Sequence, residues 1–258
     1  MKQTVAASVT RNTKTGLLVS VRDVSEARIA VRASVDIIDI KEPNKGSLGA
    51  AEAQTINEIL SVVNENTCVS VALGELHDAL DSPQKFESII SALSDSNSIA
   101  FAKLGLSKMS DRPRWCEHWA NTLSKLPRRI APVAVIYADH SIAMAPAPEE
   151  VVLTAARLDC RAVLIDTYDK RGGNLFDHLE IRQLKLIQQL VSQHKMQFVL
   201  AGSVNLSSLD KICELQPDFV AVRGAVCSDA VRTNSISLDA INTFNEELNR
   251  MTSIRDLN

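Results

Sequence analysis

Short apolar segments rich in β-branched residues recur along the chain and alternate with longer amphipathic stretches. The apolar segments have the length of β-strands and cover residues 17–21, 36–40, 68–73, 99–104, 132–137, 162–166, 198–202 and 219–223. Apolar positions recur at helical spacing in residues 53–65, 83–94 and 177–194. Eight strands, each followed by a helix-sized segment, predict an α/β protein with a parallel sheet.

The number of predicted strands and the length of 258 residues suit one closed domain. Both fit a single (β/α)8 TIM barrel, which we place at residues 17–250, after a polar N-terminal arm at residues 1–16. An open doubly wound sheet is the alternative, but no G-x-G-x-x-G motif follows the first predicted strand. The barrel is therefore the fold that we expect.

Charged residues interrupt the second predicted strand, "DIIDIK", where a core strand would be apolar. Side chains alternate along a strand, so Ile37, Asp39 and Lys41 share one face. In a barrel this face points inward, which places Asp39 and Lys41 at the carboxyl-end mouth. Burying a charge is costly unless it is paired, so these residues need either a structural partner or a chemical role.

The fourth and sixth predicted strands repeat this pattern at their carboxyl ends. Lys103 ends one inward face and Asp166 ends the other, and Lys170 follows in the loop "DTYDKRGG". Side chains of one barrel layer come from alternate strands, so these groups should converge with Asp39 and Lys41. A salt-bridge cluster that only closes the barrel is the structural alternative, although such a cluster seldom improves on a packed core.

A lysine amine that has lost its proton attacks carbonyl groups. Its ordinary pKa of about 10.4 falls when the amine is buried near another cation, and Lys103 is a candidate for that cation beside Lys41. Asp39 or Asp166 would then transfer protons. The pattern predicts Schiff-base chemistry that forms or cleaves a carbon–carbon bond in a phosphorylated sugar.

Small residues follow the last two predicted strands, in "AGSVN" and "VRGAVC". Barrels commonly bind phosphate through backbone N–H groups in these two loops. We expect a phosphate site formed by Gly202, Ser203, Arg223 and Gly224. The Arg223 side chain would add charge-assisted hydrogen bonds. Gly46 and Ser47, in "NKGSLGA", offer a second anion site at the start of a predicted helix, or Ser47 caps that helix.

Charge and cysteine content exclude several classes of partner. The formal net charge of −3 provides no basic surface for nucleic acid or membrane lipid. No apolar run approaches the roughly 20 residues that span a bilayer. The five cysteines are scattered, without a C-x-x-C pair or a histidine at metal spacing, so we expect reduced thiols in a cytoplasmic protein without bound metal.

Five motifs carry a resemblance to a known family: "DIIDIKEPNKGSLGA", "AKLGL", "LIDTYDKRGGNLFDHL", "LAGSV" and "VRGAVC". In this order they resemble the (5-formylfuran-3-yl)methyl phosphate synthases of methanofuran biosynthesis. The resemblance covers residues 17 to about 230 and implies a class I aldolase-like barrel without a cofactor. Such an enzyme joins two molecules of glyceraldehyde 3-phosphate into 4-(hydroxymethyl)-2-furancarboxaldehyde phosphate, with loss of one phosphate and two waters.

The resemblance also implies roles for individual residues. The Schiff-base lysine of the family falls on Lys41 and its proton-accepting lysine on Lys103. Its supporting acid and base positions fall on Asp39, Asp166 and Lys170. The expected ligand is a small phosphorylated triose, and we expect the chain to form homo-oligomers. Two alternatives stay open, a class I aldolase acting on another sugar phosphate and a barrel that binds a phosphate ligand without catalysis.

Overall fold

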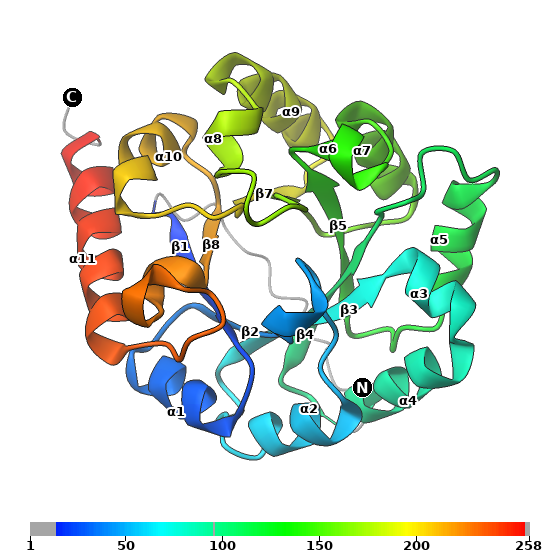
Figure 1. Cartoon of the computed structure of the whole chain (residues 1–258), viewed down its shortest axis with the longest axis horizontal. Coiled ribbons are helices and arrows are strands. Elements are labelled where there is room, and N and C mark those ends of the chain that lie inside the picture. The colour runs from blue at the N-terminus through cyan, green and yellow to red at the C-terminus, as the bar shows by residue number, and fades with distance from the viewer. Residues whose placement is uncertain (1–13, 95, 256–258) are drawn as a thin grey trace, which may run out of the picture.

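The computed structural model describes residues 14–94 and 96–255, which form a closed barrel of parallel strands (Figure 1). The strands pair in chain order, and β8 closes the barrel against β1. They are β1 (Gly16–Val21), β2 (Ile37–Ile40), β3 (Cys68–Glu75), β4 (Ile99–Gly105), β5 (Ala131–Tyr137), β6 (Ala162–Asp166), β7 (Gln197–Leu200) and β8 (Phe219–Val222). The predicted (β/α)8 barrel is confirmed.

Helices surround the barrel in Figure 1 and cover the outer face of the strands. The α-helices are α1 (Val24–Arg32), α2 (Ala53–Leu60), α3 (Leu76–Asp81), α4 (Pro83–Ser94), α5 (Trp115–Leu123), α6 (His140–Ala143), α7 (Pro148–Arg157), α8 (Leu175–His178), α9 (Ile181–Gln193), α10 (Leu209–Leu215) and α11 (Leu238–Arg255). Short 3-10 turns are η1 (Pro43–Lys45), η2 (Leu206–Ser208), η3 (Gly224–Val226) and η4 (Ser228–Ala230). None of the helices in the described part of the chain is long and apolar enough to cross a membrane.

Element boundaries depart from the sequence prediction where the backbone conformation changes. The predicted helix at 177–194 is two helices, α8 and α9, because the backbone of Glu180 is extended. Glu180 is the N-cap of α9, and its N–H donates to the Gln183 side chain at 2.9 Å. Strand β7 ends at Leu200, two residues early, because Gly202 and Ser203 have positive φ angles of 84° and 56°. The structure thus inserts a turn where the sequence predicts the end of a strand.

Alternation along the strands separates two apolar clusters. Ile38 and Ile40 belong to the larger cluster between strands and helices, which predicts that Asp39 faces inward. Val135 and Leu164 belong to the smaller cluster inside the barrel. Charged groups replace the inner cluster at the carboxyl ends of the strands. The inner apolar cluster therefore forms the floor of the candidate site.

The predicted N-terminal arm, residues 1–16, lies outside the described residues except for residues 14–16. Gly16 already begins β1, and the Thr15 hydroxyl donates to the carbonyl of Pro217 at 2.9 Å. At the other end, α11 continues past the predicted barrel limit of 250 to Arg255. The arm itself therefore stays a prediction.

Candidate active site

Asp39 and Lys103 form a buried ion pair at the carboxyl end of the barrel. Lys103 Nζ lies 2.6 Å from Asp39 Oδ1, and the two side chains are only 4% and 1% exposed. Ser70 Oγ donates to the same carboxylate at 2.7 Å and Ser20 Oγ at 3.0 Å. These hydroxyls come from the strands on either side of β2, so the sheet register fixes the carboxylate in one position.

Asp166, which is buried, and Lys170, which is half-buried, form a second ion pair on the opposite side of the site. Ser47 Oγ donates to Asp166 Oδ2 at 2.6 Å, and the Thr167 N–H donates to Oδ1 at 2.8 Å. Burial alone would raise the pKa of Asp166, but the charges of Lys170 and Lys41 outweigh it and hold that pKa below its ordinary value. Burial lowers the pKa of Lys170 in spite of the Asp166 charge.

Lys41 is different from the other two lysines. Its backbone N–H donates to the Val21 carbonyl at 3.0 Å, which extends the β1–β2 pairing by one residue. Its ammonium has no hydrogen bond or ion pair with any residue of 14–94 or 96–255. Burial lowers the pKa of Lys41 from 10.5 to about 7, an effect that the carboxylates of Asp166 and Asp39 oppose without cancelling. At neutral pH a large fraction of Lys41 is therefore the free amine.

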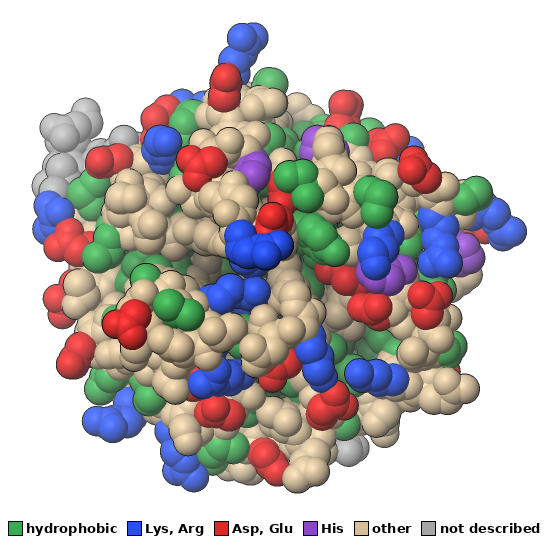
Figure 2. Space-filling view, in the orientation of Figure 1, with side chains coloured by type: hydrophobic (Ala, Val, Ile, Leu, Met, Phe, Trp, Pro, Cys, Tyr) green, Lys and Arg blue, Asp and Glu red, His purple; other side chains and the backbone are tan. Residues whose placement is uncertain are grey.

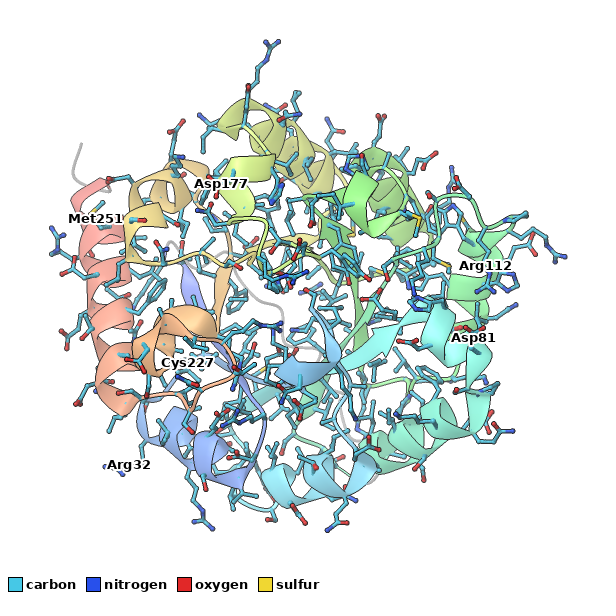
Figure 3. All side chains as sticks on the ribbon, viewed as in Figure 1. Arg32, Asp81, Arg112, Asp177, Cys227 and Met251 are labelled. Carbon is cyan, nitrogen blue, oxygen red and sulfur yellow. The ribbon has the colours of Figure 1, made fainter. Side chains whose placement is uncertain are left out.

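The five predicted catalytic residues line one cavity of about 300 Å³. They are Lys41, Lys103, Asp39, Asp166 and Lys170. Figure 2 shows basic side chains at the centre of the visible face beside a hollow, and Figure 3 shows side chains converging inside the ring of strands. The sequence thus predicted which charged groups converge, while their chemical roles remain to be tested.

Backbone N–H groups line the same cavity on the side of β7 and β8. Gly202, Ser203, Val204 and Gly224 all contribute to its wall. Among the described residues, the N–H groups of these four have no hydrogen-bond partner. Successive N–H groups in turns with left-handed residues form concave anion sites. The predicted Gly202, Ser203 and Gly224 are therefore placed where an anion such as phosphate would find donors.

Arg223 corrects one part of the predicted phosphate site. Its guanidinium is buried and donates to Glu26 at 2.8 and 3.1 Å and to the Ser20 carbonyl at 2.9 Å. It also donates to the carbonyls of Arg232 and Asn234. A guanidinium has five N–H donors, and these contacts use all of them. The side chain of Arg223 therefore holds the fold and is not available to a phosphate.

The helix that we expected to start at Gly46 and Ser47 is wrong, while the second anion site predicted there stays a prediction. No helix starts there: η1 ends before Gly46, which has a φ of 96°, and α2 begins only at Ala53. Ser47 therefore caps no helix. Its hydroxyl lies within hydrogen-bond distance of Asp166 and of the Thr167 carbonyl, at 2.6 and 2.9 Å, and so it orients the carboxylate.

Two groups near the site were not predicted from the sequence. Arg232, from the segment after β8, lines the cavity and donates to the Gly46 carbonyl at 3.0 Å. Asp139, just after β5, accepts hydrogen bonds from the Tyr168 and Asp169 N–H groups at 2.7 and 2.8 Å. These contacts fix the loop that presents Lys170. The position of Asp139 just after a predicted strand is a sequence signal that could have identified it. The sequence around Arg232 offers no comparable signal.

A closed barrel with reactive side chains in a cavity at its carboxyl end defines a (β/α)8-barrel enzyme. The family model described as 4-HFC-P synthase matches residues 17–245, so the chain belongs to this family.

Curated relatives agree with the family match. A Methanococcus maripaludis protein is 33% identical over 84% of this chain and 91% of its own length. A Methanothermobacter thermautotrophicus protein is 29% identical over 90% of this chain and 98% of its own length. Both are named "(5-formylfuran-3-yl)methyl phosphate synthase".

Solved structures share the fold at low sequence identity. Phosphoribosyl anthranilate isomerase from Thermus thermophilus has a TM-score of 0.56 at 12% identity, covering 91% of this chain and 98% of that one. 3-Hexulose-6-phosphate synthase from Salmonella typhimurium also has a TM-score of 0.56 at 12% identity, covering 93% and 99%. Identity this low supports the barrel architecture alone.

Proposed function

We propose that this protein condenses two molecules of glyceraldehyde 3-phosphate into 4-(hydroxymethyl)-2-furancarboxaldehyde phosphate through a Schiff base on Lys41. The observation that carries the proposal is a half-buried lysine with a pKa of about 7 and no ion pair within the described residues, in the same cavity as two lysine–carboxylate pairs. Membership of the 4-HFC-P synthase family and the names of the curated relatives support the product. The product would serve the biosynthesis of a methanofuran-type cofactor.

The neutral amine of Lys41 starts the reaction. It attacks the carbonyl carbon of one triose phosphate, and loss of water leaves an iminium cation. That cation acidifies the adjacent C–H, so a base can remove the proton and form an enamine. The enamine carbon attacks the aldehyde of the second triose phosphate. Elimination of inorganic phosphate and dehydration follow. Attack of a hydroxyl on the iminium carbon closes the furan ring and expels Lys41 as the free amine, and the overall loss is one phosphate and two waters.

The Asp39–Lys103 pair is the proposed proton acceptor. Because the carboxylate lies 2.6 Å from the amine nitrogen, transfer of the ammonium proton to Asp39 frees Lys103 to act as the base. Serine hydroxyls hold the carboxylate throughout, so the pair does not have to rearrange between steps. The geometry therefore supports a base that is regenerated within the cavity.

The Asp166–Lys170 pair has the second supporting role. Its carboxylate is held ionised, and its charge keeps the pKa of Lys41 from falling further. Lys170 carries a positive charge into the cavity, where it assists departure of the leaving phosphate. The N–H groups of Gly202, Ser203 and Gly224, which have no partner within the described part of the chain, would hold the phosphate that the product retains.

Incubation of the purified protein with glyceraldehyde 3-phosphate as the only substrate tests the proposal. We expect a furan chromophore and a product mass equal to two substrates less one phosphoric acid and two waters. A class I aldolase for another sugar phosphate would form no furan from this substrate alone. A barrel that only binds phosphate would form no furan, and its own mass would not increase when borohydride is added with substrate. Either result would reject the proposed reaction.

A further inference from the structure

Residues 228–235, within the segment between β8 and α11, lie at the rim of the cavity and fold back on themselves. We call them the post-β8 loop; Cys227, labelled in Figure 3, directly precedes it. The Ser228 N–H donates to the Ser235 carbonyl at 3.0 Å, and the Asn234 side chain donates to the Ser228 carbonyl at 3.1 Å. Cys227 and Ile236 pair as an antiparallel bridge beneath it. The loop therefore has one defined shape without being a strand or helix.

Two arginines attach the post-β8 loop to the barrel. Arg223 Nε donates to the Arg232 carbonyl at 2.6 Å, while its other nitrogens bond Glu26. Arg22 donates to the Thr233 carbonyl and itself lies 3.2 Å from Glu26. Glu26 is only 1% exposed. A buried carboxylate with two arginines thus fixes the backbone from which the Arg232 side chain extends.

The Arg232 side chain is half-buried and lines the cavity together with Lys41 and Lys170. One of its N–H groups donates to the Gly46 carbonyl at 3.0 Å. Its remaining guanidinium N–H groups have no partner among residues 14–94 and 96–255. Burial lowers the pKa of Arg232, yet a guanidinium stays charged in proteins. A half-buried guanidinium with unused N–H donors is suited to bind an anion.

The same cavity is lined by Gly202, Ser203 and Gly224, whose N–H groups have no hydrogen-bond partner in residues 14–94 and 96–255. We propose that Arg232 is the guanidinium that binds the phosphate of the triose substrate, with these N–H groups, and that the Arg223–Glu26 pair positions it. The nature of the substrate rests on the proposed function, whereas binding of a phosphate group does not. The competing explanation is that Arg232 only ties the post-β8 loop to Gly46.

Isothermal titration with inorganic phosphate measures this site without turnover. Arg232→Gln keeps much of the side-chain length but removes the charge, and Arg232→Lys keeps a point charge without the planar donor fork. Arg171→Gln is the matched control, because Arg171 is a 95% exposed cation outside the cavity, in the loop that also carries Lys170. Turnover of glyceraldehyde 3-phosphate is compared with that of unphosphorylated glyceraldehyde.

We expect Arg232→Gln to weaken phosphate binding about 10- to 100-fold, the usual loss for charge-assisted hydrogen bonds. Arg232→Lys should recover part of that loss, and Arg171→Gln should bind as the parent protein does. In turnover, KM for the phosphorylated substrate should rise far more than kcat falls. Unchanged phosphate affinity in Arg232→Gln, or an equal loss in Arg171→Gln, would overturn the proposal. A loss that Arg232→Lys does not recover, accompanied by a lower unfolding temperature, would assign Arg232 to the tie with Gly46.

The two proposals fail separately. If phosphate binding depends on Arg232 but no furan forms from glyceraldehyde 3-phosphate, the phosphate site stands and the proposed reaction is wrong. If furan forms but phosphate binding does not depend on Arg232, the proposed reaction stands and the assignment of Arg232 to the phosphate site is wrong.

Discussion

Lys103 Nζ lies 2.6 Å from Asp39 Oδ1, with both side chains almost completely buried. Lys41, in the same cavity, has no such partner within the described residues. One lysine is therefore held as half of an ion pair, while burial drives the other toward its neutral form. This difference is the basis for the proposed roles of Lys41 as nucleophile and Lys103 as proton acceptor, and the following predictions test them.

Asp39→Asn removes the carboxylate and leaves the Lys103 charge buried without its partner. We expect the free energy of unfolding to fall by about 3–5 kcal/mol, since breaking a buried pair is costly. Urea denaturation at pH 7 measures the change. Glu117→Gln is the control, because it breaks an exposed ion pair with Arg114 and should leave stability almost unchanged. Equal effects of the two substitutions would contradict the assignment of a buried pair.

Lys41→Met should make the protein more stable at neutral and acidic pH. The folded protein binds the Lys41 proton less tightly than the unfolded chain does, with a pKa of about 7 against 10.5. The resulting destabilisation is fully present below pH 7 and disappears as pH rises toward 10.5. At pH 6 we expect the variant to gain on the order of 5 kcal/mol over the parent protein, since each pKa unit between the folded and unfolded states is worth about 1.4 kcal/mol. Chemical denaturation from pH 6 to 10 should show the gap closing; a gap that does not depend on pH would mean that Lys41 keeps its ordinary pKa.

The rate of imine formation should rise with pH through a limb near pH 7, because only the neutral amine of Lys41 attacks. Asp166→Asn removes a carboxylate that raises the pKa of Lys41 and releases the Lys170 charge, which lowers it. The limb should therefore move to lower pH in this variant. Borohydride trapping at short times, from pH 5 to 9, measures it. A limb that moves upward would mean that Asp166 acts on another group.

Glu26→Gln should loosen the post-β8 loop and weaken substrate binding without touching the substrate. The substitution removes the charge that pairs with Arg223, whose Nε holds the Arg232 carbonyl. We expect stability to fall by about 3 kcal/mol and KM to rise, with a smaller change in kcat. Steady-state kinetics and thermal unfolding are measured on the same preparation. A fall in stability with KM unchanged would show that the pair supports the barrel and does not position Arg232.

Period-two alternation was enough to predict the core of the site. A barrel strand has only two faces, and side chains of one inner layer come from alternate strands, so inward Asp39 on β2 and Lys103 on β4 had to meet near the carboxyl ends of the strands. Arg232 could not be found in this way. It follows Arg223 by nine residues, in a segment without periodicity, and its direction depends on hydrogen bonds to backbone carbonyls.

The Arg223 error has a related cause. Sequence position identified a cation at the phosphate-binding end of the barrel but gave no sign of Glu26, which lies 197 residues away in the chain and takes up that charge. The sequence predicts Ser47 as a helix cap or part of an anion site because it predicts a helix after Gly46. The structure instead directs its hydroxyl to Asp166, a residue from a distant strand. Long-range partners of single side chains are not encoded in local patterns.

The most direct test of the account is to trap the enzyme with borohydride during turnover of glyceraldehyde 3-phosphate and to map the modified peptide by mass spectrometry. We predict a substrate-dependent mass gain on Lys41 in the parent protein. Lys41→Arg should fold normally but show neither mass gain nor furan, because a guanidinium does not deprotonate to form an imine. A mass gain on Lys103 or Lys170, or turnover retained by folded Lys41→Arg, would contradict the assignment of Lys41 as the nucleophile.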